Sequence, residues 1–414
     1  MGSLVLKNAR VFDGVQEECA EGMQLLIDAG VIREVSSTPI NASGADVIDV
    51  GGRTVMPGLI DAHIHAYFCD VNWQKVDHAG EAYRTAHAIR MLGHALDCGF
   101  TTVRDIGGGD YGLWRAIQDR LVRAPRFFYA GKMLSMTGGH GDTRLMHESE
   151  HTQGYCACGG EANALNVVVD GVDACIKAAR EELRRGAHCI KIMASGGVAS
   201  PTDPIWMNQY RADEIRAIVN ETVERRSYVS AHCHPISAIR RCVEFGVRVI
   251  EHGTLMDEAT AKFVAEKGAF VVPTLVIIYV LAEQGRQLGL PAASQAKVEI
   301  IVKKAQEGLE AMRRAGVKVG FGTDLLGETH VQQCREFTLR KEVFKAIDIL
   351  RQATSVNAEI LQQADQLGCI KEGAHADLLV VDGDPLQNID LLAAGGRHLR
   401  LIMRAGELIR NDLS

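Results

Sequence analysis

Two kinds of hydrophobic pattern divide the chain into end segments and a middle segment. Residues 1–57 and 365–414 alternate apolar and polar positions with a period of two and carry Gly or Asp-Gly turn signals, as in SLVLKNARVFDG and HADLLVVDGDPL. Such alternation predicts short β-strands joined by turns. Because chain termini often lie close together, we expect the two ends to pair into one small β-sandwich domain.

The middle segment, residues 58–364, alternates apolar runs with helical stretches. Eight runs have the character of buried strands: LIDAHIH, FTTVRDIG, RFFYAGKML, CIKIMASGG, YVSAHCH, VRVIEHGT, FVVPTLVII and VKVGFGTD. Helical stretches between them include AYRTAHAIRMLGHALDCG, VDACIKAAREELRRGA and ADEIRAIVNETVERR. Alternation of strands and helices predicts parallel strands, and eight repeats over about 300 residues predict an α/β fold of the (β/α)8 TIM-barrel type.

A long segment, residues 137–170, interrupts this pattern after the third predicted strand. Loops of this length in compact domains are usually functional or mobile. His147 and His151 fall in it at the expected mouth of the barrel, but we assign them no role. Cys156 and Cys158 form a CxC pair, for which a second metal site is the less favoured interpretation because no further Cys or His pair stands close by.

Composition and charge narrow the class of protein. The 414 residues are 47% hydrophobic and 23% charged, as in globular proteins with a large core. The net charge of -7 argues against a nucleic-acid partner. No apolar run is long enough to span a membrane, and the first residues lack a signal-peptide layout. We therefore expect a cytoplasmic protein without a membrane partner, whose eleven cysteines are buried apolar groups or free thiols.

Residues that bind metals stand at the ends of the predicted strands. His63 and His65 close the first strand, where positions i and i+2 share one face. Alone, this pair fits a metal site and two hydrogen-bonded core histidines about equally well. Four further strands carry such residue types, namely Lys191, His232 with His234, His252 and Asp324. Barrel enzymes place their chemistry at these strand ends, and imidazole with carboxylate suits Zn²⁺, with Fe or Mn as alternatives.

Lys191 is the unusual member of this set. A bare ammonium inside a barrel is costly and repels a cation. The lysine could stay neutral, pair with a carboxylate, or combine with CO₂ to give an anionic carbamate that bridges two metals. Pairing is the favoured interpretation for an isolated buried lysine, whereas the surrounding ligand set favours the carbamate.

Several segments resemble the amidohydrolase superfamily, and the resemblance covers nearly the whole chain. They are MPGLIDAHIH, the strand-four lysine, SAHCH, VIEHG, GTD and GAHADLLVVDGDPL. The resemblance implies two divalent metals such as Zn²⁺, with N6-carboxylysine at Lys191 as the bridge. It places His63, His65 and Asp324 on the first metal, and His232 and His252 on the second.

Within that superfamily the chain is most similar to metal-dependent dipeptidases of the imidazolonepropionase-like branch. The similar segments are SMTGGHGD, KIMASGGVASPTDP, HCHP and FGTDLLGE. Members of that group cleave Xaa-Pro dipeptides, as prolidases do, and near relatives cleave Xaa-Arg or Xaa-Lys dipeptides. The resemblance therefore implies a small dipeptide substrate, and a homo-oligomer is expected because such barrels often assemble.

A mechanism follows from this expected site. A metal-bridging hydroxide would attack the peptide carbonyl, and Asp324 would take the remaining proton and pass it to the departing nitrogen. His140, among glycines in TGGHGD, is the favoured oxyanion donor over a structural loop histidine. His234 is expected to touch substrate oxygens rather than a loop carbonyl. Tyr210 is a weaker substrate candidate, in a loop where Trp206 and Met207 suggest an apolar cover.

Other functions remain open at this point. The same metal site could serve a Xaa-Arg or Xaa-Lys dipeptidase, or a hydrolase of a cyclic amide or imidazolone. An acidic residue facing the leaving group would favour arginine or lysine as that group. The segment GGVASPTDPIW offers no acidic candidate except Asp203, so we favour proline. A non-catalytic scaffold would not need Lys191 or Asp324.

The remaining polar residues receive supporting or structural roles. Asp105 is expected behind a metal histidine, Tyr228 in the barrel core, and Glu251 pointing away from the barrel axis. Three histidines, His78, His87 and His94, are expected at the surface or behind the ligands.

Overall fold

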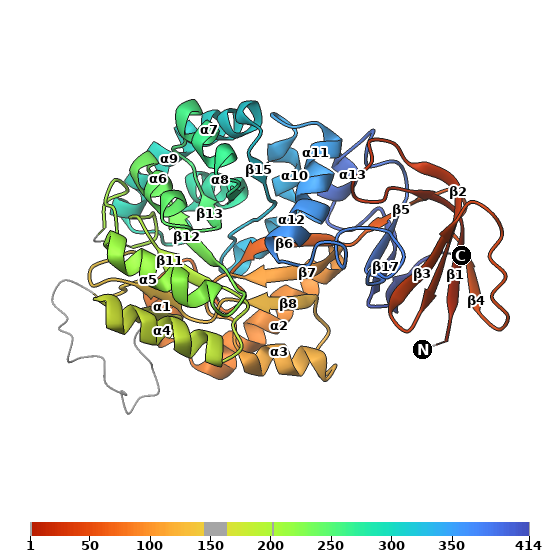
Figure 1. Cartoon of the computed structure of the whole chain (residues 1–414), viewed down its shortest axis with the longest axis horizontal. Coiled ribbons are helices and arrows are strands. Elements are labelled where there is room, and N and C mark those ends of the chain that lie inside the picture. Colours follow the sequence, from red (N-terminus) through yellow and green to blue (C-terminus); the bar gives the residue numbers. More distant parts are fainter. Residues whose placement is uncertain (1, 145–163, 201–202, 414) are drawn as a thin grey trace.

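The computed structural model describes residues 2–144, 164–200 and 203–413. The predicted positions His147, His151, Cys156 and Cys158 lie outside these ranges. Figure 1 shows a large body of strands surrounded by helices, with a small sheet at one side that holds both chain ends. The described cysteines are free thiols, as expected.

The middle of the chain forms two parallel sheets, with strand orders β6-β7-β8 and β10-β9-β11-β12-β13-β14-β15. Their bounds are β6 (Leu59–Ile64), β7 (Phe100–Asp105), β8 (Arg126–Tyr129), β9 (Met133–Ser135), β10 (Asn166–Val168), β11 (Ile190–Met193), β12 (Val229–Cys233), β13 (Val249–His252), β14 (Phe270–Val272) and β15 (Lys318–Val319).

Backbone hydrogen bonds join the edges of these two sheets. The N–H of His188, just before β11, donates to the carbonyl of Tyr129 at the end of β8 (2.8 Å). On the other side, the N–H of Ala62 in β6 donates to the carbonyl of Phe321, just past β15 (2.9 Å). The parallel strands therefore close into the predicted barrel, and the third predicted strand is divided between β8 and β9.

Helices connect the strands and lie outside them (Figure 1). Their bounds are α1 (Trp73–His78), α2 (Glu81–Asp97), α3 (Tyr111–Gln118), α4 (Val172–Arg184), α5 (Ala212–Val223), α6 (Ile236–Glu244), α7 (Glu258–Glu266), α8 (Leu275–Gln284), α9 (Ala292–Ala315), η2 (Gly327–Gln332), α10 (Arg335–Arg340), α11 (Ala346–Arg351), η3 (Gln352–Val356), α12 (Asn357–Ile360) and α13 (Asp390–Ala393).

The three predicted helices are confirmed as α2, α4 and α5. In α5 the buried side chains include Ile215, Ile218, Val219 and Thr222, at the spacing of one helical face. This face packs the helix against the barrel and leaves the opposite face polar. Among the described helices, none combines the length and apolar character that crossing a membrane requires.

One predicted strand is partly wrong. In FVVPTLVII the strand β14 ends at Val272, and the following residues form helix α8. Pro273 and the N-cap Thr274 separate the two elements. The first turns of α8 are buried on several sides, so the sequence shows no polar stripe that would distinguish a helix from a strand.

The two chain ends form one sheet of order β18-β17-β16-β5-β1-β2-β3, with β4 paired to β1. Its strands are β1 (Leu4–Val11), β2 (Ala20–Asp28), β3 (Val31–Ser36), β4 (Asp46–Asp49), β5 (Thr54–Pro57), β16 (Leu378–Val381), β17 (Leu399–Arg404) and β18 (Glu407–Asn411). Antiparallel pairing of β16 with β5 joins the two ends, with Leu378 opposite Pro57. The sandwich form, the domain boundaries, the compartment and the homo-oligomer stay predictions.

Candidate metal and active site

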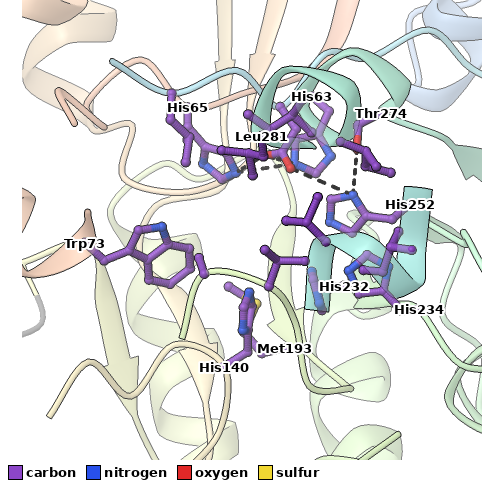
Figure 2. A pocket seen from close by; sticks show the side chains of 18 of the residues that line it. His63, His65, Trp73, His140, Met193, His232, His234, His252, Thr274 and Leu281 are labelled. Carbon is purple, nitrogen blue, oxygen red and sulfur yellow. Dashed lines mark hydrogen bonds and ion pairs between the residues drawn. The ribbon is translucent and has the colours of Figure 1, made fainter. Parts of the chain in front are cut away.

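The six side chains predicted as metal ligands line one cavity at the C-terminal ends of the barrel strands. With its open mouth included, the cavity encloses about 680 Å³ of empty space. Its predicted ligands are His63 in β6, His65 just after it, Lys191 in β11, His232 in β12, His252 at the end of β13 and Asp324 after β15. Figure 2 shows the labelled imidazoles arranged around this space.

His63, His65 and Asp324 form the tightest cluster. The Nε2 atoms of the two histidines are 3.3 Å apart, and Oδ1 of Asp324 lies 3.2 Å from Nε2 of His63 and 3.1 Å from Nε2 of His65. Burial favours the neutral acid, yet the two imidazoles hold the pKa of Asp324 well below its usual range. An ionised carboxylate and two imidazoles at these separations can hold one divalent cation.

His232 and His252 extend the cluster across the cavity. Their ring centroids are 4.6 Å apart, and His252 lies 5.0 Å from the ring of His63. The Nδ1 of His252 faces the hydroxyl of Thr274 at 2.8 Å, and Nε2 of His232 faces the carbonyl of Gly196 at 3.3 Å. Among the described residues, each ring therefore has one nitrogen engaged by the protein, which leaves the other for a cation.

Lys191 is the one lysine of this cavity among the described residues, and its side chain is 1% exposed. Burial lowers the pKa of its ammonium, although Glu251 and Asp324 act in the opposite direction. The neutral amine is the form that can combine with CO₂. Four imidazoles, a carboxylate and such a lysine are a donor set that fits two divalent cations.

Glu251 supports this site, and the expectation that it points away from the barrel axis is wrong. Its Oε2 lies 2.6 Å from Nδ1 of His63, and its Oε1 accepts a hydrogen bond from Arg104 (2.6 Å). The next residue, His252, has a φ of 67°. This left-handed conformation breaks the alternation of the strand, so Glu251 points inward and His252 still reaches the cavity.

Replacing Glu251 with glutamine is expected to lower the free energy of unfolding by about 3 to 5 kcal/mol, because Arg104 would keep a buried charge without its partner. Urea unfolding of the metal-free protein measures the loss. The matched control is Glu283→Gln, which breaks an exposed pair with Arg335 and should cost less than about 1 kcal/mol. Equal losses in the two variants would contradict this role.

His140 lies beside the predicted ligands, as expected. Its ring stacks on His232 with centroids 4.4 Å apart and faces Trp73 at 5.2 Å. Figure 2 shows His140 and Trp73 on one side of the cavity, across from His63 and His65. The ring of His140 is also in close contact with the backbone at Gly197.

The substitution Gly197→Ala is expected to lower kcat about a hundredfold by displacing His140. A methyl group at this position would lie 2.7 Å from Nδ1 and nearer still to two other ring atoms. The control Gly93→Ala places its methyl 3.8 Å from the nearest atom and should leave kcat unchanged. Steady-state kinetics with metal content measured in parallel test the prediction, which fails if both variants behave alike.

His234 also lines the cavity, in agreement with its predicted position. Its Nδ1 faces the hydroxyl of Thr254 at 3.2 Å, and its ring lies 4.7 Å from that of His232. Burial lowers the pKa of His234 to about 3, so the ring is neutral. A neutral imidazole with one nitrogen facing the cavity suits contact with a substrate oxygen or N–H.

Tyr210 is not brought to this site. It is buried outside the cavity lining, where burial raises the pKa of its phenol well above the usual value. Trp206 is 74% exposed, and neither it nor Met207 lines the cavity. The apolar contacts of this loop come instead from Val198 and Ala199. The sequence does not indicate which residues of this loop face the cavity, because the path of a loop depends on tertiary packing.

A second missed feature is an aliphatic wall contributed by two helices. Helix α8 provides Ile277, Ile278 and Leu281, and α9 provides Val298 and Ile301. The predicted strand FVVPTLVII was too long and included the start of α8. The residues of this wall could therefore not be placed at the cavity from the sequence. Trp73, Met133, Met193 and Leu326 complete the apolar lining.

The supporting residues differ in how well they were predicted. Tyr228 lies in the barrel core, as expected. Asp105 accepts hydrogen bonds from the backbone of Ala66 and Gly107 rather than from a histidine ring. It acts on the ligands indirectly, because Nδ1 of His65 faces the carbonyl of Gly107 at 3.3 Å. His78 is exposed, His94 half-buried, and His87 buried beside His330.

Known proteins similar to this chain include ochratoxinase, an amidohydrolase and a prolidase. The chain is 30% identical to ochratoxinase of Aspergillus niger over 349 residues, which is 81% of this chain and 71% of that protein. A crystal structure of an amidohydrolase is 47% identical with a TM-score of 0.96 and covers 100% of both chains. A prolidase crystallised with N-methylphosphonate-L-proline is 45% identical with a TM-score of 0.95, covering 99% of this chain and 100% of that one.

The model of the Amidohydrolase family matches residues 54–408, which include the whole barrel and all six predicted ligands. Members of this family generally bind divalent metals at such a site. The chain therefore belongs to the amidohydrolase family.

Proposed function

We propose that the protein is a dinuclear metal-dependent dipeptidase that hydrolyses the peptide bond of Xaa-Pro dipeptides. The observation that supports the proposal is the convergence of six side chains of types that can bind metals, together with His140 and His234, on one largely apolar cavity. The 45% identical prolidase with its bound prolyl phosphonate supports proline as the C-terminal residue.

The proposed cations are two Zn²⁺ ions, with Lys191 carboxylated as their bridge. His63, His65 and Asp324 would hold one of them, and His232 and His252 the other. When bound, such ions lower the pKa of a water and polarise the carbonyl of the substrate. The carbamate would turn a buried cation-repelling group into an anionic ligand, which explains a lysine among these histidines.

The remaining chemistry belongs to side chains of the chain itself. Asp324 is ionised and faces the cavity, so its carboxylate can take a proton from the attacking water and pass it to the leaving nitrogen. A proline nitrogen is the nitrogen of a tertiary amide, and its departure depends on that proton. His140 and His234 both line the cavity next to the ring of His232 and are proposed to hold the substrate oxygens.

The lining of the cavity favours proline over arginine or lysine as the leaving residue. Among the described residues that line it, Asp324 supplies the one carboxylate. Asp203, the candidate acid in the loop after β11, is 0% exposed, lies outside the lining and has Lys297 at 3.6 Å. The aliphatic wall of α8 and α9 instead fits an apolar side chain.

A dipeptide panel tests this proposal directly. Zinc-loaded protein is assayed with Leu-Pro, Leu-Arg and Leu-Lys, and with a cyclic imidazolone. We expect the largest kcat/KM for Leu-Pro. Cleavage of Leu-Arg or Leu-Lys without Leu-Pro would overturn the substrate, and cleavage of the imidazolone alone would overturn the peptidase. Absence of hydrolysis from all four would overturn the proposed reaction.

A further inference from the structure

Asp203 lies directly behind His140, in the loop that follows β11. Its Oδ2 is 3.1 Å from Nδ1 of His140 and accepts hydrogen bonds from the backbone N–H of Gly197 (3.0 Å) and from Nε2 of Gln209 (3.1 Å). Because Oδ2 already accepts from two N–H donors, it is the acceptor towards the ring as well, and the imidazole proton that points at Asp203 sits on Nδ1. This leaves Nε2 as the ring nitrogen for the cavity.

The same loop also holds the backbone of His140. The amide oxygen of Gln209 accepts a hydrogen bond from the backbone N–H of His140 at 2.9 Å. Ser200 offers a second acceptor to the ring, with its hydroxyl 3.2 Å from Nδ1. Residues far along the chain therefore help to set the orientation of His140.

Lys297 of helix α9 ties this loop to the barrel. Its ammonium donates to the carbonyls of Gly197 (2.9 Å), Ser200 (2.8 Å) and Asp203 (2.6 Å). Its neighbour Val298 lines the cavity, so one turn of α9 both forms the apolar wall and fixes the loop. Three charge-assisted hydrogen bonds from one ammonium hold the backbone carbonyls of Gly197, Ser200 and Asp203 in place.

We propose that Asp203 is a positioning residue for His140 and that Lys297 keeps Asp203 in place. The inference rests on the proposed function only in that His140 holds a substrate oxygen there. A hydrogen bond that fixes Nδ1 also fixes the position of Nε2 before the substrate binds. Without this hydrogen bond the ring would lose its preorganised orientation and donate less effectively. A purely structural role, in which Asp203 only balances the charge of Lys297, makes different predictions.

The decisive experiment is a double-mutant cycle on the holoenzyme with His140→Ala, Asp203→Asn and the combined variant. Asparagine keeps the shape of the side chain. We expect Asp203→Asn to lower kcat about a hundredfold with little change in KM. Because Asp203 acts through His140, the combined variant should be no slower than His140→Ala alone. Multiplicative losses would overturn the inference, as would an unchanged kcat in Asp203→Asn.

Lys297→Met supplies a second variant that leaves the carboxylate intact, with Lys304→Met as its control on the same helix. Lys304 is exposed and pairs with Glu307, so its loss should leave kcat unchanged. We expect Lys297→Met to lower kcat, as Asp203→Asn does. Equal kcat values in the two lysine variants would contradict the proposal that Lys297 keeps Asp203 in place.

A spectroscopic measurement separates this inference from the proposed function. In ¹⁵N-labelled holoenzyme without substrate, the Nδ1 proton of His140 should be protected from exchange and should disappear in His140→Ala. The protection of this proton should be weaker in Asp203→Asn and should persist in a Ser200→Ala control. If no Xaa-Pro dipeptide is cleaved, the proposed function fails, but this signal still shows whether Asp203 is hydrogen-bonded to Nδ1 of His140. If the protected proton is absent from the wild type, the inference is overturned.

Discussion

Replacing Asp324 with asparagine should lower kcat by about 10²- to 10⁴-fold, the range expected when a general acid–base group is removed. Its carboxylate lies within 3.2 Å of the Nε2 atoms of His63 and His65, and its pKa is held well below the usual range. The asparagine has nearly the same shape and keeps one oxygen as a ligand, but it cannot accept and return a proton.

Steady-state kinetics on an Xaa-Pro dipeptide and metal analysis of the same samples test this expectation together. We expect most of the metal to remain while hydrolysis is lost. Asp390→Asn is the control, since Asp390 forms a surface ion pair with Lys341 and should have no effect. Undiminished hydrolysis in the Asp324 variant would remove the proposed proton transfer.

Loss of the Lys191 side chain should be at least as damaging. Alanine at this position would remove the proposed bridge, so we expect the metal content to fall and hydrolysis to drop by more than about 10³-fold, because Lewis-acid stabilisation is worth several kcal/mol. A short carboxylate such as propionate fits the space left by the side chain and should restore part of the metal binding and activity.

Rescue by propionate distinguishes a lost ligand from a collapsed core. Lys191 is buried, so the alanine variant is also expected to be less stable, but a merely destabilised core would not respond to a carboxylate. Lys304→Ala, at an exposed position, is the matched control for the metal assay. Full activity of the Lys191 variant without added carboxylate would exclude the bridging role.

The sequence predicts most of this site because the barrel fixes where strands end. Each of the predicted strands LIDAHIH, CIKIMASGG, YVSAHCH, VRVIEHGT and VKVGFGTD carries at least one of the predicted metal ligands, and parallel strands bring their ends together at one face. No knowledge of side-chain packing is needed for that step. The strands of the two chain ends were predicted from alternation and turn signals, and their pairing from the tendency of chain termini to lie close together.

The features that the sequence does not predict depend on conformations without a local signal. Glu251 turns inward because His252 adopts a left-handed φ, which residue type alone does not indicate. Helix α8 lacks a polar stripe, so its contribution to the cavity could not be separated from that of β14. Tyr210 and Asp203 lie in one loop, but Asp203 contacts His140 whereas Tyr210 is buried outside the cavity lining, and no local sequence signal distinguishes the two positions.

The central claim is that Lys191 carries a carbamate between two metal ions. Carbon-13 NMR of protein reconstituted with Zn²⁺ in ¹³C-labelled bicarbonate tests it most directly. The account predicts one protein-bound carbamate resonance in the wild type that is absent from Lys191→Ala and disappears when the metal is removed. A fully active, zinc-loaded wild-type sample without that resonance would contradict the account.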